Sequence, residues 1–162
     1  MDTIILEIAS IKGNCGIEGF IGQIIVQSFN HSASIPMQMD RANIERTAGR
    51  PSFSELSFSK SSDISTPALY SACVSGTKLG DAKIHIGRTE GKVFMSLIEY
   101  VLSNAMVSSV STSGGGGQPS DSFSLNYTKI TQVYTQQKED STTKGSAGFG
   151  WDLIKNEDAT PK

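Results

Sequence analysis

The sequence predicts one mainly β domain with antiparallel pairing and a single short helix. Apolar and polar residues alternate along most of the chain, and this spacing places successive side chains on opposite faces of a strand. Only one segment carries both a helix start signal and a helix stop signal. At 162 residues, the chain is long enough to bury the core of one domain and leaves little length for a second.

Each strand is predicted from this alternation. Ala82, Ile84 and Ile86 are apolar, whereas Lys83 and His85 between them are polar, which is typical of an antiparallel sheet with one wet face. From residue 93 to residue 102 the polar alternation is lost, and this predicts a strand covered on both faces, either by the fold itself or by a neighbouring subunit. The predicted strands cover residues 3–9, 22–31, 52–60, 82–88, 93–102, 105–111, 122–135 and 150–154.

The helix is expected over residues 67–75. Thr66 suits the N-cap, Pro67 suits the first helical position, and Gly76 follows the last turn. Side chains four residues apart form an apolar stripe that can pack on a sheet or close the end of a barrel. The residues of this stripe are Leu69, Tyr70, Cys73 and Val74.

The segment between His31 and Ser52 is long for an unstructured loop in one domain, and long loops are commonly functional. It contains apolar residues that a solvated loop does not need, and the adaptable side chains of its methionines suit a surface that meets a partner. The alternative is that the segment folds back onto its own core. The residues of interest are Ile35, Met37, Met39, Arg41, Ile44, Glu45 and Arg46.

Charge and hydropathy exclude several classes of partner. Fourteen Lys and Arg residues against sixteen Asp and Glu residues leave a net charge of −2, without the basic stripe that nucleic acid or an anionic membrane requires. The start of the chain carries Asp2 in place of a basic region, so we expect no secretory signal peptide. No apolar run approaches the roughly 20 residues of a membrane helix, and we expect synthesis as a soluble cytosolic protein.

The sequence does not predict an enzyme, a metal site or a cofactor. Cys15 and Cys73 lie far apart with no histidine at ligand spacing. His31 and His85 lack an acid and a nucleophile in a recognised order. The glycines at 114–117 are followed by a strand pattern in place of a phosphate-binding helix, and residues 145–150 are expected to form a turn before the final strand.

Five segments, taken in order, resemble those of one protein family, the haemolysin-coregulated protein (Hcp) family. The longest are S-E-L-S-F-S-K-S-S-D-I-S-T-P-A-L-Y-S-A-C-V-S-G at residues 54–76 and V-S-S-V-S-T-S-G-G-G-G at residues 107–117. The others are S-L-N-Y-T-K-I at 124–130, Y-T-Q-Q-K at 134–138 and G-W-D-L-I-K-N at 150–156. Together they extend the resemblance over residues 4–156.

The resemblance implies a small β-barrel of two antiparallel sheets with one short flanking helix, here over residues 1–155. It also implies the inner tube of the bacterial type VI secretion system, built from stacked hexameric rings. The resemblance further implies a contractile sheath that propels this tube, a spike protein at its tip and effector proteins carried in its lumen. Release from the cell is expected to need no signal peptide. The loop between His31 and Ser52 then becomes the expected stacking element. Residues 156–162 form a charged tail that we expect to be disordered.

In the strand near residue 30, Ser28 and Asn30 share one face, and we expect them to face the lumen and its cargo. The alternative is that they face solvent on a free barrel. Two other functions stay open at this point: a monomeric β-sandwich binding module, and a phage-type tail-tube protein that shares the tube architecture.

Overall fold

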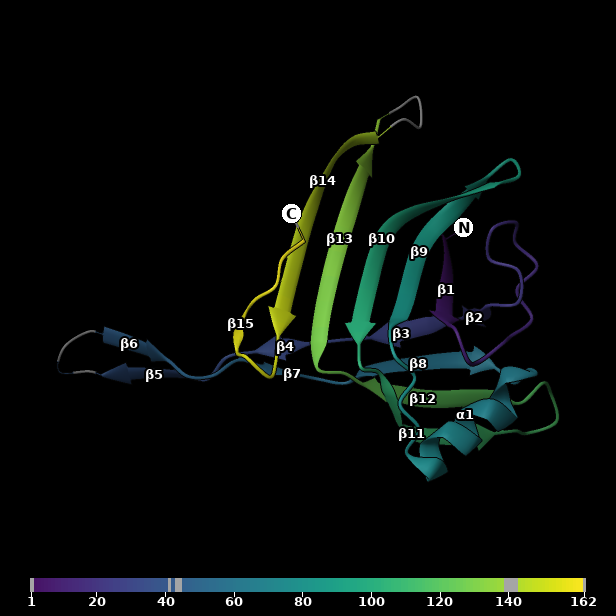
Figure 1. Cartoon of the computed structure of the whole chain (residues 1–162), viewed down its shortest axis with the longest axis horizontal. Coiled ribbons are helices and arrows are strands. Elements are labelled where there is room, and N and C mark those ends of the chain that lie inside the picture. Colours follow the sequence, from purple (N-terminus) through teal and green to yellow (C-terminus); the bar gives the residue numbers. More distant parts are fainter. Residues whose placement is uncertain (1, 41, 43–44, 139–142, 162) are drawn as a thin grey trace.

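The computed structural model describes residues 2–40, 42, 45–138 and 143–161. Two antiparallel sheets cross one another, with α1 (Ser65–Ser75) beside the smaller sheet (Figure 1). The larger sheet has the order β15 (Glu157–Asp158), β14 (Thr143–Asp152), β13 (Lys129–Gln137), β10 (Val93–Ser103), β9 (Ala82–Glu90), β1 (Asp2–Ile8) and β2 (Ile24–Val26). The smaller sheet has the order β11 (Met106–Ser113), β12 (Ser120–Asn126), β8 (Leu56–Ser61) and β3 (Ser28–Asn30).

Two predicted strands are each divided between the sheets. The strand expected over residues 22–31 breaks at Gln27, so that β2 pairs with β1 and β3 pairs with β8. The strand expected over residues 122–135 breaks at Tyr127 and Thr128, so that β12 joins the smaller sheet and β13 the larger. These breaks are barrel corners, at which the chain leaves one sheet and enters the other. The mainly β class and the antiparallel pairing are confirmed.

The core lies between the two sheets and under α1. It is formed by the inward side chains of alternating strands, and burial of these apolar side chains is the main force that holds the sheets together. Its fully buried members include Leu6, Ile8, Ile24, Leu56, Leu69, Ile84, Leu102, Leu125 and Ile130. On β10, which we expected to be covered on both faces, the middle residues are half-buried and Val93 is exposed.

The helix differs from its prediction at the start and agrees at the end. Ile64 occupies the N-cap without a side-chain bond, and the first-turn backbone N–H of Ser65 is bonded 2.9 Å from Oδ1 of Asp63. Thr66 is not the N-cap, because the helix already begins at Ser65, and its hydroxyl donates to Asp121 instead. Gly76 ends the helix in the left-handed conformation at φ 63°, as its position predicts.

The predicted apolar stripe of the helix is only half correct. Leu69 is fully buried and Cys73 is half-buried, but Val74 is 84% exposed. Tyr70 is exposed as well, and its hydroxyl lies 2.9 Å from Oγ1 of Thr112 on β11. The buried face runs through Ser65, Leu69 and Ala72, and the last two belong to the hydrophobic core. No helix in the described part of the chain is long and apolar enough to cross a lipid bilayer.

The end of the chain contains two further corrections. Residues 145–150, expected as a turn, lie within β14, because their backbone pairs with β13. The tail expected to be disordered contains β15, in which Asp158 pairs with Trp151. The backbone N–H of Ala159 donates to the carbonyl of Gly150 at 3.0 Å and holds the tail against the edge of β14, and the N–H of Thr160 donates to Asp158 at 2.8 Å in a local turn.

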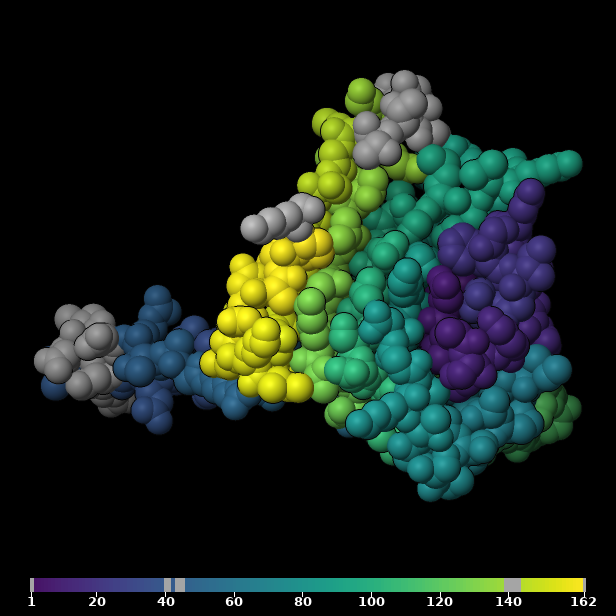
Figure 2. All heavy atoms as spheres, in the orientation of Figure 1, coloured from purple at the N-terminus to yellow at the C-terminus, as the bar shows by residue number. Residues whose placement is uncertain are grey.

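The segment between His31 and Ser52 forms two ribbons. Near the body, β4 (Ala33–Ser34) pairs with β7 (Ser52–Phe53), and farther out β5 (Met37–Asp40) pairs with β6 (Glu45–Ala48). The β5–β6 ribbon, which we call the arm, projects away from both sheets (Figures 1 and 2). It does not fold back onto the core. Arg41 and Ile44 lie outside the described residues.

Candidate functional site

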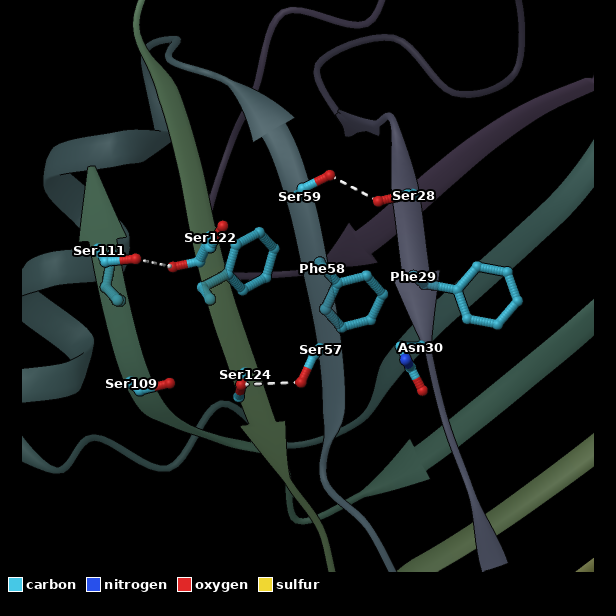
Figure 3. Close-up of a pocket in the computed structure, with 12 residues that line it drawn as sticks. Ser28, Phe29, Asn30, Ser57, Phe58, Ser59, Ser109, Ser111, Ser122 and Ser124 are labelled. Carbon is cyan, nitrogen blue, oxygen red and sulfur yellow. Dashed lines mark hydrogen bonds between the residues drawn. The ribbon is translucent and has the colours of Figure 1, made fainter. Parts of the chain in front are cut away.

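The exposed face of the smaller sheet is covered by small polar side chains. Ser28 and Asn30 of β3, the two residues predicted from sequence, both point onto this face (Figure 3). The other three strands contribute Ser57, Ser59, Ser109, Ser111, Ser122 and Ser124. These eight residues form the serine face, which is hollowed into a shallow depression of about 450 Å³. None of the residues that line the depression is charged.

Strand alternation produces this face. Phe58 and Phe123 stand between the serines of β8 and β12, point to the other side of the sheet and stack in the core at 5.1 Å. Cross-strand register then places serine beside serine. The hydroxyl oxygens of Ser28 and Ser59 lie 2.6 Å apart, and those of Ser57 and Ser124 lie 3.2 Å apart.

Both long edges of the smaller sheet are open. In the order β11-β12-β8-β3, the described residues supply no further strand beyond β3 or beyond β11. The unpaired backbone N–H and C=O groups of such edges are templates for pairing with another chain. The serine face therefore belongs to a sheet with an unpaired strand at each edge among the described residues.

A buried charged cluster lies beneath one end of the sheet. Nζ of Lys60 lies 2.9 Å from Oδ2 of Asp121, and neither side chain has exposed surface. Lys60 also donates to Asp63 at 2.8 Å and to Thr66 at 3.1 Å. Ser62, Thr66 and Thr112 donate to Asp121 as well. The cluster ties β8, β12 and β11 to the first turn of α1.

Hydrogen bonding keeps Asp121 ionised. Burial alone raises the pKa of Asp121, but hydrogen bonds from Thr66, Lys60, Ser62 and Thr112 outweigh it and lower the pKa from 3.8 to about 2. Sequence reasoning missed this cluster. A signal was present, because Lys60 and Asp121 occupy the same strand phase as the buried residues Phe58 and Phe123.

The two histidines have structural partners. The hydroxyl of Tyr127 donates to the carbonyl of Ser54 at 2.8 Å, so Nε2 of His31, also at 2.8 Å, donates to the tyrosine oxygen. Burial lowers the pKa of His31. His85 lies between Glu7, 3.2 Å from Nε2, and Glu99, 3.6 Å from Nδ1. Among the described residues, no group of three or more His, Cys, Asp or Glu is arranged to hold a metal ion.

An aromatic pocket of about 530 Å³, which we call the socket, lies at the base of the arm. Its lining includes Phe149 and Trp151 of β14, and Ile35, Pro51 and Phe53 from the segment that carries the arm. The rings of Phe53 and Phe149 stack at 6.3 Å. The sequence did not predict this pocket, since residues 145–150 were expected to form a turn and pairing with β13 makes them part of a strand.

Comparison with known proteins supports the family resemblance found in the sequence. The family described as "Type VI secretion system effector, Hcp" matches residues 5–134. Protein hcp1 of Pseudomonas aeruginosa is 35% identical over 105 residues, and the match spans 63% of this chain and 65% of that protein. A solved structure described as a type six secretion system protein has a TM-score of 0.89 at 22% identity, with 98% and 99% of the two chains covered. Hcp1 from Salmonella typhimurium has a TM-score of 0.79 at 20% identity, with 97% and 98% covered.

The crossed sheets, the flanking helix and the open sheet edges define a mainly β protein with the fold that these solved structures share. The family match covers most of the chain and includes the serine face and the buried cluster. The chain belongs to the Hcp family of type VI secretion proteins, and the resemblance drawn from sequence is confirmed.

Proposed function

We propose that this protein is the tube subunit of a type VI secretion system, which forms hexameric rings that stack and are secreted. The observation that carries the proposal is the serine face, an uncharged polar surface on a sheet whose two edges are open. Family membership supports the same role. The role is structural, and it needs no cofactor.

A ring follows from pairing the two open edges. When β11 of one copy meets β3 of the next, the same contact repeats around the ring and closes it. The serine faces of all copies then turn inward and line the lumen. A lumen wall of this kind stays wet, because serine hydroxyls hydrogen-bond with water as readily as with one another.

The lumen is the proposed site for effector cargo. Ser28 and Asn30 offer hydroxyl and amide groups that donate and accept hydrogen bonds without a fixed charge. Individual hydrogen bonds exchanged against water contribute only about 1 kcal/mol each. Cargo is therefore held weakly at many points and is released when the ring disassembles outside the cell.

The arm is the proposed stacking element. Met37 and Met39 are 60% and 65% exposed and Ile35 is 39% exposed, so apolar surface is available where the arm leaves the body. Arg41, Ile44, Glu45 and Arg46 complete the segment that we assign to contacts between rings. Spike protein at the tip and a contractile sheath outside the tube are the remaining proposed partners.

The test is the native mass of the purified protein, measured by light scattering behind a sizing column. We expect a hexamer of the 17.3 kDa chain. A protein that stays monomeric at every concentration and in the presence of its assembly partners would overturn the tube proposal.

One observation favours a second function, a monomeric binding module. The socket is lined by Phe53, Phe149 and Trp151, and aromatic-lined pockets commonly bind ligands. The mass measurement separates the two, because a binding module needs no ring. A phage-type tail tube shares the ring and differs only in the particle assembled around it.

A further inference from the structure

We propose that the socket at the base of the arm receives the arm of a second copy of this chain, with Met37 and Met39 seated in the socket and Arg46 beside Asp158. This inference rests on the proposed assembly into a tube and goes beyond it, because it assigns the surface that the arm meets. The partner is therefore an identical subunit, and each subunit both gives an arm and accepts one.

One face of the arm is mainly apolar and suits an apolar pocket. Met37 is opposite Ala48 and Met39 is opposite Arg46, and cross-strand partners point to the same face of a ribbon. This face is apolar with one cation at its outer end. The other face carries Gln38 opposite Thr47, which are both polar. The arm is therefore two-sided, as a ribbon that docks by one face requires.

The socket has the complementary chemistry. It is lined mainly by aromatic and aliphatic side chains, and the flexible thioether of methionine packs well against aromatic rings. The buried Nε1–H of Trp151 has no hydrogen-bond partner within the described part of the chain. Because this atom is enclosed within the subunit, an arriving methionine meets the half-buried indole ring and not Nε1.

Charge matches at the rim. Asp158 is directly opposite Trp151 in the pairing of β15 with β14, so its carboxylate lies on the socket side of the sheet. Hydrogen bonds from the hydroxyl and backbone of Thr160 lower the pKa of Asp158, so it is an anion at neutral pH. An incoming arm that seats Met39 brings the guanidinium of Arg46 to this side of the pocket.

A subunit does not fill its own socket. The ribbon pairing continues to the base of the arm, where the backbone N–H of Gly49 donates to the carbonyl of Pro36 at 2.8 Å. A β-carbon at Gly49 would lie 2.7 Å from Cγ of Pro36, so the two strands are closely packed there. The described strands of the arm project away from the two sheets (Figures 1 and 2). Only a second copy can bring Met39 to Trp151.

Trp151 is the single tryptophan of the chain and reports directly on its socket. We expect its emission to move to shorter wavelength as the full-length protein assembles, because the arriving arm removes water. The variant Met37→Gln with Met39→Gln should lose this shift, whereas Gln38→Ala on the opposite face should keep it. If the double variant assembles with the full shift, the socket assignment is wrong and the tube proposal stands. If the wild-type protein never assembles, both fail.

Disulfide trapping gives a second readout. Met39→Cys protein and tagged Ser34→Cys protein, both in a Cys73→Ser background, are mixed at assembling concentration and oxidised. Ser34 is exposed at the rim of the socket, and a disulfide forms only when the two Cα atoms come within about 7 Å. We expect the mixed dimer on a gel, and little of it when Gln38→Cys replaces Met39→Cys. Equal yields from both pairs would overturn the proposal.

The charge pair provides a rescue test. Arg46→Glu and Asp158→Arg should each weaken the tryptophan shift, since each places like charges together in the assembly. The chain with both changes should recover the shift, because the pair is restored with its signs exchanged. If the combined variant assembles, as its native mass shows, but does not recover the shift in tryptophan emission, then Asp158 does not take part in the contact.

Discussion

Lys60 and Asp121 form an ion pair with no exposed surface, in which Nζ and Oδ2 are 2.9 Å apart. The pair joins β8 to β12, and through Thr66 it reaches the first turn of α1. Every oxygen of Asp121 has a donor, because Ser62 and Thr112 bond to Oδ1 at 2.7 and 2.8 Å. A buried pair of this kind is costly to break and specifies one arrangement of strand and helix.

Replacement of Asp121 by Asn should destabilise the fold strongly. The change leaves the Lys60 ammonium buried beside a neutral group, and loss of one partner of a buried pair typically costs about 3 to 5 kcal/mol. The measurement is the free energy of unfolding from a urea titration. Asp81→Asn, at an exposed carboxylate, is the matched control and should change that free energy little. A loss below about 1 kcal/mol for Asp121→Asn, the level of exposed pairs, would contradict the buried-pair account.

Stability should also fall in acid. The folded pKa of Asp121 is about 2 against an ordinary value of 3.8, so its contribution is complete above pH 3.8 and is lost as the pH falls toward 2. A depression of this size corresponds to about 2 kcal/mol. The check is the difference in unfolding free energy between wild type and Asp121→Asn, measured from pH 5 to pH 2. This difference should shrink with acid, and a constant difference would refute the assignment.

Replacement of Asn30 by Trp should narrow the lumen without changing the ring. Asn30 is exposed on the serine face, so a larger side chain projects into the proposed lumen and displaces nothing from the core. We expect an unchanged native mass and a lower yield of effector proteins that copurify with the ring. Ser71→Trp, on the exposed side of α1, is the control. Equal cargo in all three proteins would remove Asn30 from the lumen.

Deletion of residues 35–46, with a short Gly-Ser link, should separate ring formation from stacking. None of the described residues of this segment belongs to the core between the sheets, so we expect the barrel and its open edges to remain. Light scattering should show rings, and electron microscopy should show few tubes at concentrations where the wild-type protein forms them. Normal tubes from the deletion variant would refute the role of the arm.

The sequence by itself determined the local features. Alternation placed Ser28 and Asn30 on an exposed face, and Gly76 marked the end of the helix. The anomalous Lys60 and Asp121, each in a buried phase, could have been found in the same way. The family followed from motifs in order. All of these depend on residues close together in the chain, for which strand and helix geometry sets the side-chain direction.

Only the tertiary structure decided the features that depend on distant pairing. Alternation continues unchanged through Gln27, so it does not reveal that β2 and β3 join different sheets. The glycine-rich residues 145–150 looked like a turn, but pairing with β13 makes them strand and brings Phe149 and Trp151 to the base of the arm. Sheet partners are chosen by long-range backbone hydrogen bonds and core burial, and local propensity yields to them.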